Sequence, residues 1–314
     1  MWAIFFCICR RLLFLYMNEK IVKKFLEYLE YEKKYSSHTI LAYRKDIMDF
    51  ISFCKEEFNQ NFEDVGYNQI RCWIVQLSSG KLVNRSINRK LSSLKTFYNY
   101  LVKIREVSEN PMVKHRSLKE QKKISIPFSE KEVNEVIDLI KRKVGFEGLR
   151  DRLILELLYS TGIRRAELIH IKLKDLYFEE GVLRILGKGN KERFVVLLPF
   201  VIETIQTYQL ERKMLQEIKD RDYLLLTKKG VKIYETLVYR IINSYFRRVS
   251  TKVKKSPHVL RHAFATHLLN RGASLFSVKE LLGHSSLAST QVYTNSSLEE
   301  LKQVYNKTHP REFD

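Results

Sequence analysis

Along the first third of the chain, apolar residues recur at the three- and four-residue spacing of amphipathic helices. The helices predicted from this pattern are residues 18–35, a helix capped by Ser36 or Ser37, residues 68–77, and a helix that begins near Asn84 or Ser86. Each has one apolar face, and four such faces can enclose a common core. Residues 17–105 are therefore predicted to form a small helical bundle.

Beyond residue 127 the pattern mixes helices and short strands. One helix is predicted to begin near Ser129, and a strongly apolar one ends at Thr161-Gly162. Three β-rich segments separated by glycine turns follow, at residues 176–178, 182–186 and 193–198. They predict a three-stranded antiparallel meander. The fold class is thus mainly α, with this small sheet in the second domain.

After Pro199 the pattern returns to helix and stays helical almost to the end, with Gly272 and Gly283 placed as helix C-caps. Residues 106–127 contain two prolines and many charges but no clear period, so they are predicted to be a linker. The second domain is accordingly expected to span residues 128–314.

Residues 1–16 differ from the rest because two apolar runs flank Arg10 and Arg11. A membrane span needs about 20 apolar residues, and a signal peptide carries its positive charge before the apolar run. Neither order is present here. We expect Met17 to be the true start and residues 1–16 to be an over-extended start; a membrane anchor is the rival interpretation.

The net charge of the chain indicates what kind of molecule it binds. The chain has 56 Lys and Arg against 36 Asp and Glu, a net charge of +20. A chain this basic is expected to bind a polyanion, first of all DNA or RNA. Its four cysteines form no CxxC pair, which predicts neither a disulfide framework nor a zinc site and favours a reducing cytoplasmic compartment.

The residues that suggest chemistry lie in three segments: 160–168 (STGIRRAEL), 258–262 (HVLRH), and 281–284 (LLGH) followed by 290–294 (TQVYT). Two arginines from separate segments can clamp one phosphate, because guanidinium is planar and permanently charged. A tyrosine hydroxyl can act as nucleophile when a histidine handles its proton. His258 and His262 also allow a zinc interpretation, but no HExxH glutamate or third ligand accompanies them, so no metal is predicted. His262 and His267 are predicted to pack between helices.

In these segments, together with 86–98 (SINRKLSSLKTFY) and 187–193 (GKGNKER), the chain resembles the tyrosine recombinases of Xer type. The resemblance runs from about Met17 to Pro310. It implies a SAM-like core-binding domain that clamps duplex DNA, followed by a catalytic domain. Arg165 and Ala166 depart from the commoner family pattern, in which a small hydrophobic residue and a serine follow the first arginine.

The family roles, carried over residue by residue, give six catalytic residues. They imply that Arg164 and Arg261 clamp the scissile phosphate, Lys188 is the general acid, His258 assists proton transfer, His284 contacts a non-bridging oxygen, and Tyr293 is the nucleophile. No cofactor is implied. The last helix, near residues 298–308, would dock on a neighbouring protomer or pack within its own chain.

The function implied is site-specific DNA recombination through a 3′-phosphotyrosyl intermediate, with chromosome dimers resolved at cell division. The partners implied are a double-stranded recombination site, a homo- or hetero-tetramer with a related recombinase, and a DNA-translocase activator. The expected location is the cytoplasm, in association with the nucleoid. An integrase or invertase of a mobile element and a non-catalytic DNA-binding protein remain alternatives, and the sequence does not distinguish an XerC-like from an XerD-like partner.

Overall fold

The computed structural model describes residues 19–120, 126–187, 192–252 and 254–282. The chain divides into two compact units, Met1–Lys123 and Ile124–Asp314, each with its own hydrophobic core. The described residues are mainly helical and include one small antiparallel sheet. The predicted fold class is therefore confirmed.

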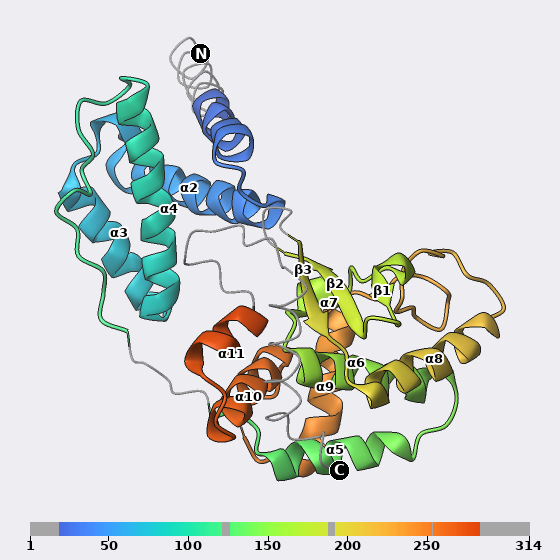
Figure 1. The fold of residues 1–314 in the computed structure, drawn as a ribbon. Coiled ribbons are helices and arrows are strands. Elements are labelled where there is room, and N and C mark those ends of the chain that lie inside the picture. The colour runs from blue at the N-terminus through green and yellow to red at the C-terminus, as the bar shows by residue number, and fades with distance from the viewer. Residues whose placement is uncertain (1–18, 121–125, 188–191, 253, 283–314) are drawn as a thin grey trace. The chain divides into compact units, whose positions relative to one another are not determined.

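The first unit is a bundle of helices in which α4 packs against both α2 and α3 (Figure 1). Residues 19–27 are helical and continue into a π-helical turn. Ser36 caps α2 as predicted, because its hydroxyl accepts a hydrogen bond from the Thr39 N–H at 3.3 Å. The elements are η1 (Tyr28–Glu32), α2 (Ser37–Phe58), η2 (Phe62–Asp64), α3 (Tyr67–Ser79) and α4 (Asn84–Lys103).

The segment that follows α4 is bonded back onto it. The side-chain amide of Asn88 donates to the Leu118 carbonyl at 2.9 Å and accepts from the Leu118 N–H at 2.9 Å. Asn110 accepts from the Met112 N–H at 2.8 Å, and Met112 is fully buried in the core of the unit. Residues 106–120 of the predicted linker therefore run along α4 as part of the first unit, whereas residues 126 and 127 belong to the second.

The second unit is built around α6, an almost wholly buried helix that packs against α5, α8 and α10 (Figure 1). The Ser129 hydroxyl accepts from the Glu132 N–H at 3.2 Å, and the Glu132 carboxylate accepts from the Ser129 N–H at 2.7 Å, which starts α5 with a capping box. The helices are α5 (Glu130–Lys141), α6 (Phe146–Thr161), α7 (Arg165–Leu168), η3 (Leu173–Asp175), α8 (Pro199–Lys213), α9 (Glu235–Val249), α10 (Pro257–Asn270) and α11 (Leu275–Leu282).

The sheet is an antiparallel meander in the order β1-β2-β3, as the glycine turns predict. Its strands are β1 (Leu176–Tyr177), β2 (Val182–Leu186) and β3 (Glu192–Val196). Leu183 and Ile185 on β2 and Val195 on β3 are buried in the core of the unit. Arg193 on β3 is also buried, two positions from Val195, so the core-facing side of this strand carries a charge.

The prediction of helix from Pro199 almost to the end was wrong over residues 214–234. Leu224, Leu225 and Leu226 are consecutive and all buried, a pattern that a buried helix such as α6 also shows. They are extended instead: the Leu224 N–H donates to the Ile171 carbonyl at 2.9 Å, and Leu226 forms an isolated bridge with Lys232.

The helix end predicted at Gly272 is confirmed, because α10 ends just before it. Gly272 has φ +92°, and the Ala273 N–H bonds back to the Leu268 carbonyl at 3.0 Å. Gly283, residues 1–16 and Met17 lie outside the described residues. Within the described ranges, no helix has both the length and the apolar content needed to cross a bilayer.

Candidate active site

The candidate active site is built around the tight turn that ends α6. Gly162 ends this helix with φ +61°, a left-handed conformation that costs little only for glycine. A Cβ at this position would lie 2.4 Å from Cδ1 of Phe264 on α10 and 2.9 Å from Cδ2 of Leu282 on α11. The glycine therefore allows both the turn and the close approach of two further helices.

Arg261 on α10 is held against this turn. One guanidinium nitrogen donates to the Gly162 carbonyl and the other donates to the Leu282 carbonyl at 2.7 Å. The residue is buried, and this burial, followed by the nearby charge of Arg164, lowers the pKa of Arg261 to about 10. Arg261 therefore stays protonated at neutral pH, and the two carbonyls fix its orientation.

Arg164 is the residue just before α7, on the same turn. Its backbone N–H donates to Glu167 at 2.7 Å, and its guanidinium donates to the other oxygen of the same carboxylate at 2.9 Å. The side chain is 38% exposed, so part of the guanidinium remains open to a ligand. The capping role of Glu167 thus positions both the backbone and the side chain of Arg164.

Glu167 is shared with a second arginine. Arg193 donates to Glu167 through two nitrogens, at 3.0 and 2.9 Å, and both side chains are buried. Burial by itself would raise the pKa of Glu167, but the bonds and charge of Arg193 and the bonds from Arg164 outweigh it and lower the pKa. The carboxylate is therefore ionised at neutral pH.

This cluster can bind an anion. The guanidinium groups of Arg164 and Arg193 bond one carboxylate, and Arg261 adds a third positive charge close enough to interact with all three groups, which leaves a surplus of positive charge in a partly buried place. Phosphoryl transfer is catalysed mainly by positioning and by neutralising charge that develops on the phosphate oxygens. Guanidinium groups bind phosphate oxygens well, because they are planar and permanently charged, so a phosphate diester is a suitable anion for this cluster.

His258 lies one turn before Arg261 on α10, in the first turn of the helix, and its side chain is exposed. Of the two histidines predicted to pack between helices, His267 does so: it is buried and lies 2.8 Å from the Tyr159 hydroxyl through its Nδ1. The prediction for His262 was wrong, because this residue is exposed. His262 follows Arg261 directly, and neighbouring helical positions face different directions.

The structure thus describes Arg164, His258 and Arg261 among the six predicted catalytic residues. Lys188, His284 and Tyr293 lie outside the described residues. The roles assigned to all six stay predictions.

Arg165, which departs from the commoner family pattern, has an acidic partner on a neighbouring helix. Its guanidinium forms an ion pair with Glu235, the first residue of α9. The two side chains are partly exposed, at 29% and 40%. The pair joins α7 to the start of α9, so the extra arginine is accommodated outside the core.

Sequence reasoning did not single out Glu167 or Arg193, although both stand in the quoted motifs. A signal was available: Arg193 is two residues before Val195 on a predicted strand, which places both on the same face. A charged residue on a core-facing position needs a buried partner. The partner itself could not be inferred, because Glu167 is 26 residues away on another element.

A row of polar side chains along α9 forms a second candidate surface. A hollow of about 490 Å³ is lined by Tyr239, Arg240, Asn243, Ser244, Arg247 and Arg248. Residues spaced by three and four lie on one side of a helix. This row combines arginine with asparagine, the side chains that most often read base edges in the major groove.

In the first unit, the motif of residues 86–98 is tied to the fold by one buried aspartate. Asp46 accepts from Arg89 Nη2 at 2.9 Å, from Lys90 at 3.2 Å and from the Ser93 hydroxyl at 2.8 Å. Lys90 is itself buried and also pairs with Asp49 at 2.7 Å. Lys90 is therefore a structural charge, whereas the Arg89 side chain remains 52% exposed.

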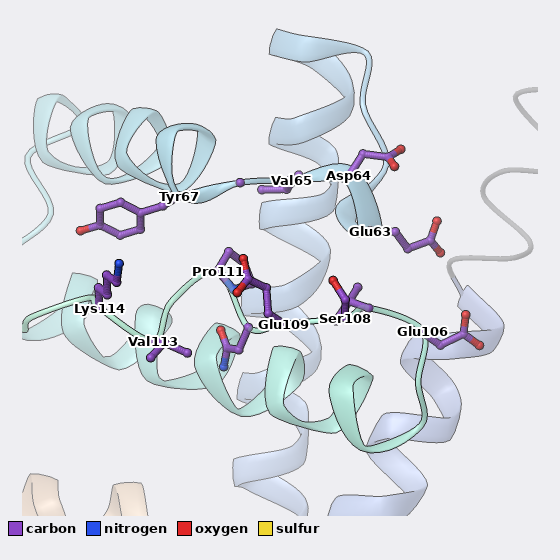
Figure 2. Close-up of a pocket in the computed structure, with 13 residues that line it drawn as sticks. Glu63, Asp64, Val65, Tyr67, Glu106, Ser108, Glu109, Pro111, Val113 and Lys114 are labelled. Atoms are coloured by element: carbon purple, nitrogen blue, oxygen red, sulfur yellow. The ribbon is translucent and has the colours of Figure 1, made fainter.

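A hollow of about 660 Å³ in the first unit does not suit DNA (Figure 2). Figure 2 shows Glu63 and Asp64 on one side of it, and Glu106 and Glu109 on the segment that follows α4. Loss of solvent and the charges of Asp64 and Glu106 raise the pKa of Glu63. Phosphates would be repelled here, so the hollow is not a candidate nucleic-acid site.

The comparisons with known proteins identify the family of the chain. Residues 22–104 match the N-terminal SAM-like domain of phage integrases, and residues 127–300 match the phage integrase family. The chain belongs to the phage integrase family and is a site-specific tyrosine recombinase.

The relatives found include tyrosine recombinase XerC of Anoxybacillus flavithermus, which is 38% identical and aligns over 91% of this chain and 96% of its own length. Tyrosine recombinase XerC of Staphylococcus haemolyticus is 38% identical over 93% of this chain and 98% of its own. The predicted membership of the tyrosine recombinases and the predicted enzyme class are therefore confirmed.

Solved structures share the fold. The XerH recombinase bound to its difH substrate has a TM-score of 0.68 at 24% identity, over 87% of this chain and 77% of that one. The Tn1549 transposon integrase in complex with DNA has a TM-score of 0.67 at 19% identity, over 89% of this chain and 98% of that one. Both likenesses concern the fold alone.

Proposed function

We propose that this recombinase cuts and rejoins DNA through a covalent 3′-phosphotyrosyl intermediate. The observation that supports this best is the arginine pair. Arg164 and Arg261 come from separate segments, and both are oriented by groups at the end of α6 and the start of α7, the Gly162 carbonyl and the Glu167 carboxylate. A scissile phosphate between them would meet two fixed positive charges, which is what the transition state requires.

In the proposed step, one phosphate ester bond is exchanged for another. The Tyr293 hydroxyl oxygen attacks phosphorus while His258 assists removal of its proton. The bond from phosphorus to the 5′-oxygen breaks, and Lys188 gives a proton to this leaving oxygen, which departs as a 5′-hydroxyl. His284 donates a hydrogen bond to a non-bridging oxygen. The new phosphotyrosyl ester keeps the energy of the phosphodiester, so rejoining requires neither ATP nor a metal ion.

For DNA recognition we propose the row of polar side chains along α9. Arg240 and Arg247 are exposed, Asn243 is partly exposed, and the three repeat at helical spacing on one side of the helix. The ion pair between Arg165 and Glu235 fixes the start of this helix next to the turn that carries Arg164. A base-reading surface would then be held in register with the phosphate clamp. The XerH structure in complex with difH supports a DNA recombination site as the partner.

The proposed biological role is the resolution of chromosome dimers at cell division, in the cytoplasm and at the nucleoid. Four protomers, of this chain alone or with a related recombinase, would act on two DNA sites and cut in pairs through a Holliday junction. A DNA translocase would be the activator. Relatives named XerC at 36% to 38% identity over most of the chain support this role over that of a mobile-element integrase.

A nicked suicide substrate tests the proposed chemistry. Cleavage releases a short fragment that carries the free 5′-hydroxyl, and without this hydroxyl the covalent complex cannot rejoin the strand. The full chain is expected to give a protein–DNA band that survives SDS, and Tyr293→Phe is expected to give none while binding DNA with an unchanged Kd. Tyr31→Phe is the matched control, since Tyr31 is 73% exposed in the first unit. An SDS-resistant band from Tyr293→Phe would overturn the assignment of the nucleophile.

A further inference from the structure

The bond set of Glu167 is unusually complete. One carboxylate oxygen accepts from the guanidinia of Arg164 and Arg193, at 2.9 and 3.0 Å. The other accepts from the Arg164 backbone N–H at 2.7 Å and from Arg193 at 2.9 Å. Four donors therefore fix the carboxylate in position, and the two that come from Arg193 arrive from a different element, β3.

Arg193 does not reach the surface. Only 8% of its side chain is exposed, compared with 38% for Arg164. Arg164 is thus the more open of the two to a phosphate, whereas both terminal nitrogens of Arg193 are bonded to Glu167. The bonds to Glu167 are therefore the direct route by which Arg193 can act on the reaction, together with its electric field, which also reaches Arg261.

Arg193 also changes the charge balance. Glu167 with Arg164 alone would form a nearly neutral pair, because the carboxylate would neutralise the charge of the guanidinium. A second arginine on the same carboxylate offsets that charge. The combined group stays positive, and part of the Arg164 charge is available to an incoming anion.

We propose that Arg193 is a positioning residue for recombination: from β3 it fixes Glu167, and through Glu167 it orients Arg164 toward the scissile phosphate and preserves the positive charge there. The proposal rests on the proposed function, in which Arg164 binds that phosphate. A purely structural ion pair between the sheet and α7 is the alternative, and it makes a different prediction about substrate charge.

The test compares two suicide substrates in single-turnover cleavage by the full chain. One has an ordinary scissile phosphate, and the other has a methylphosphonate, which lacks the negative charge. Arg193→Met is expected to slow cleavage of the phosphate by about 10- to 100-fold, because a misplaced reacting group costs roughly that much. On the neutral methylphosphonate the same variant should come within about threefold of the unchanged protein, because no phosphate charge remains for Arg164 to bind. The Kd for DNA should not change.

Arg184→Met is the matched control. Arg184 lies on the neighbouring strand β2 and pairs with Asp175 at 2.8 Å, so this variant also removes an arginine ion pair from the sheet. It should cleave both substrates at the unchanged rate. Arg193→Lys keeps the charge but loses the two-nitrogen geometry, and it should show a smaller loss on the phosphate substrate only.

Equal losses on both substrates, or no loss on either, would overturn the positioning role. If thermal unfolding shows that Arg193→Met does not fold, Arg193→Lys decides by the same comparison of substrates. Failure of the unchanged protein to form any covalent complex would refute the proposed function itself, and it is therefore distinguishable from failure of this proposal.

Discussion

Replacing Gly162 by alanine should damage stability and cleavage together. The residue has φ +61°, where a side chain costs about 1–2 kcal/mol. The new Cβ would also lie 2.4 Å from Phe264, and overpacking of this kind costs about 1–3 kcal/mol. The free energy of unfolding of the second unit should therefore fall by about 2–5 kcal/mol, which lowers its Tm by roughly 4–20 °C.

Gly272→Ala provides the matched control. Gly272 has φ +92°, but nothing lies within 4 Å of a Cβ built there. This variant should lose only the conformational part, about 1–2 kcal/mol. Scanning calorimetry of the full-length variants measures the difference, which should be about 1–3 kcal/mol.

Cleavage supplies the second readout. The Gly162 carbonyl accepts a hydrogen bond from Arg261, so a shift of this turn moves the guanidinium. A misplacement of about 1 Å can cost about 100-fold in rate. Gly162→Ala should thus form covalent complex far more slowly than Gly272→Ala at a temperature where both are folded. Equal stability and equal cleavage of the two variants would refute the reasoning about the close approach of α6, α10 and α11.

Four further predictions concern acid stability, the first unit, DNA binding and metal independence. Burial would raise the pKa of Glu132, but its bonds to Lys252 and Ser129 lower it to about 2, so this carboxylate stabilises the fold above its ordinary pKa and loses that effect as pH falls toward 2. The difference in Tm between the unchanged protein and Glu132→Gln should shrink over that range, and a constant difference would contradict the assignment. Asp46→Asn should destabilise the first unit by about 2 kcal/mol, measured by hydrogen exchange, because three donors lose a buried charge; equal loss of protection in the second unit would argue against this. DNA affinity should fall about 10³-fold or more between 50 and 200 mM salt, and cleavage should persist in excess EDTA; a flat salt response, or cleavage that needs added Mg²⁺, would contradict the account.

The sequence predicted most of what depends on local patterns. The bundle helices, the caps at Ser36 and Ser129, and the meander all follow from spacing and turn residues within a few positions. The extended run at residues 224–226 was missed because three consecutive buried leucines fit a helix or a strand equally well until their partner, Ile171, is known.

At the site, too, the sequence predicts local features but not long-range contacts. Arg164 and Arg261 could be predicted from short motifs and from the chemistry of guanidinium. Their orientation could not, because it depends on the Gly162 carbonyl and on the ion pair of Glu167 with Arg193, which join segments 99 and 26 residues apart. Long-range pairs of this kind leave only an indirect trace in one sequence, such as a charged residue at a core-facing strand position.

The central claim is that a tyrosine of this chain becomes covalently joined to DNA at a 3′-phosphate. The most direct measurement is mass spectrometry of peptides from the trapped complex on a nicked suicide substrate, after nuclease and protease digestion. The account predicts a 3′-linked nucleotide adduct on Tyr293, and a free 5′-hydroxyl on the released strand. An adduct on another residue, a 5′-phosphate linkage, or cleavage without any covalent adduct would contradict it.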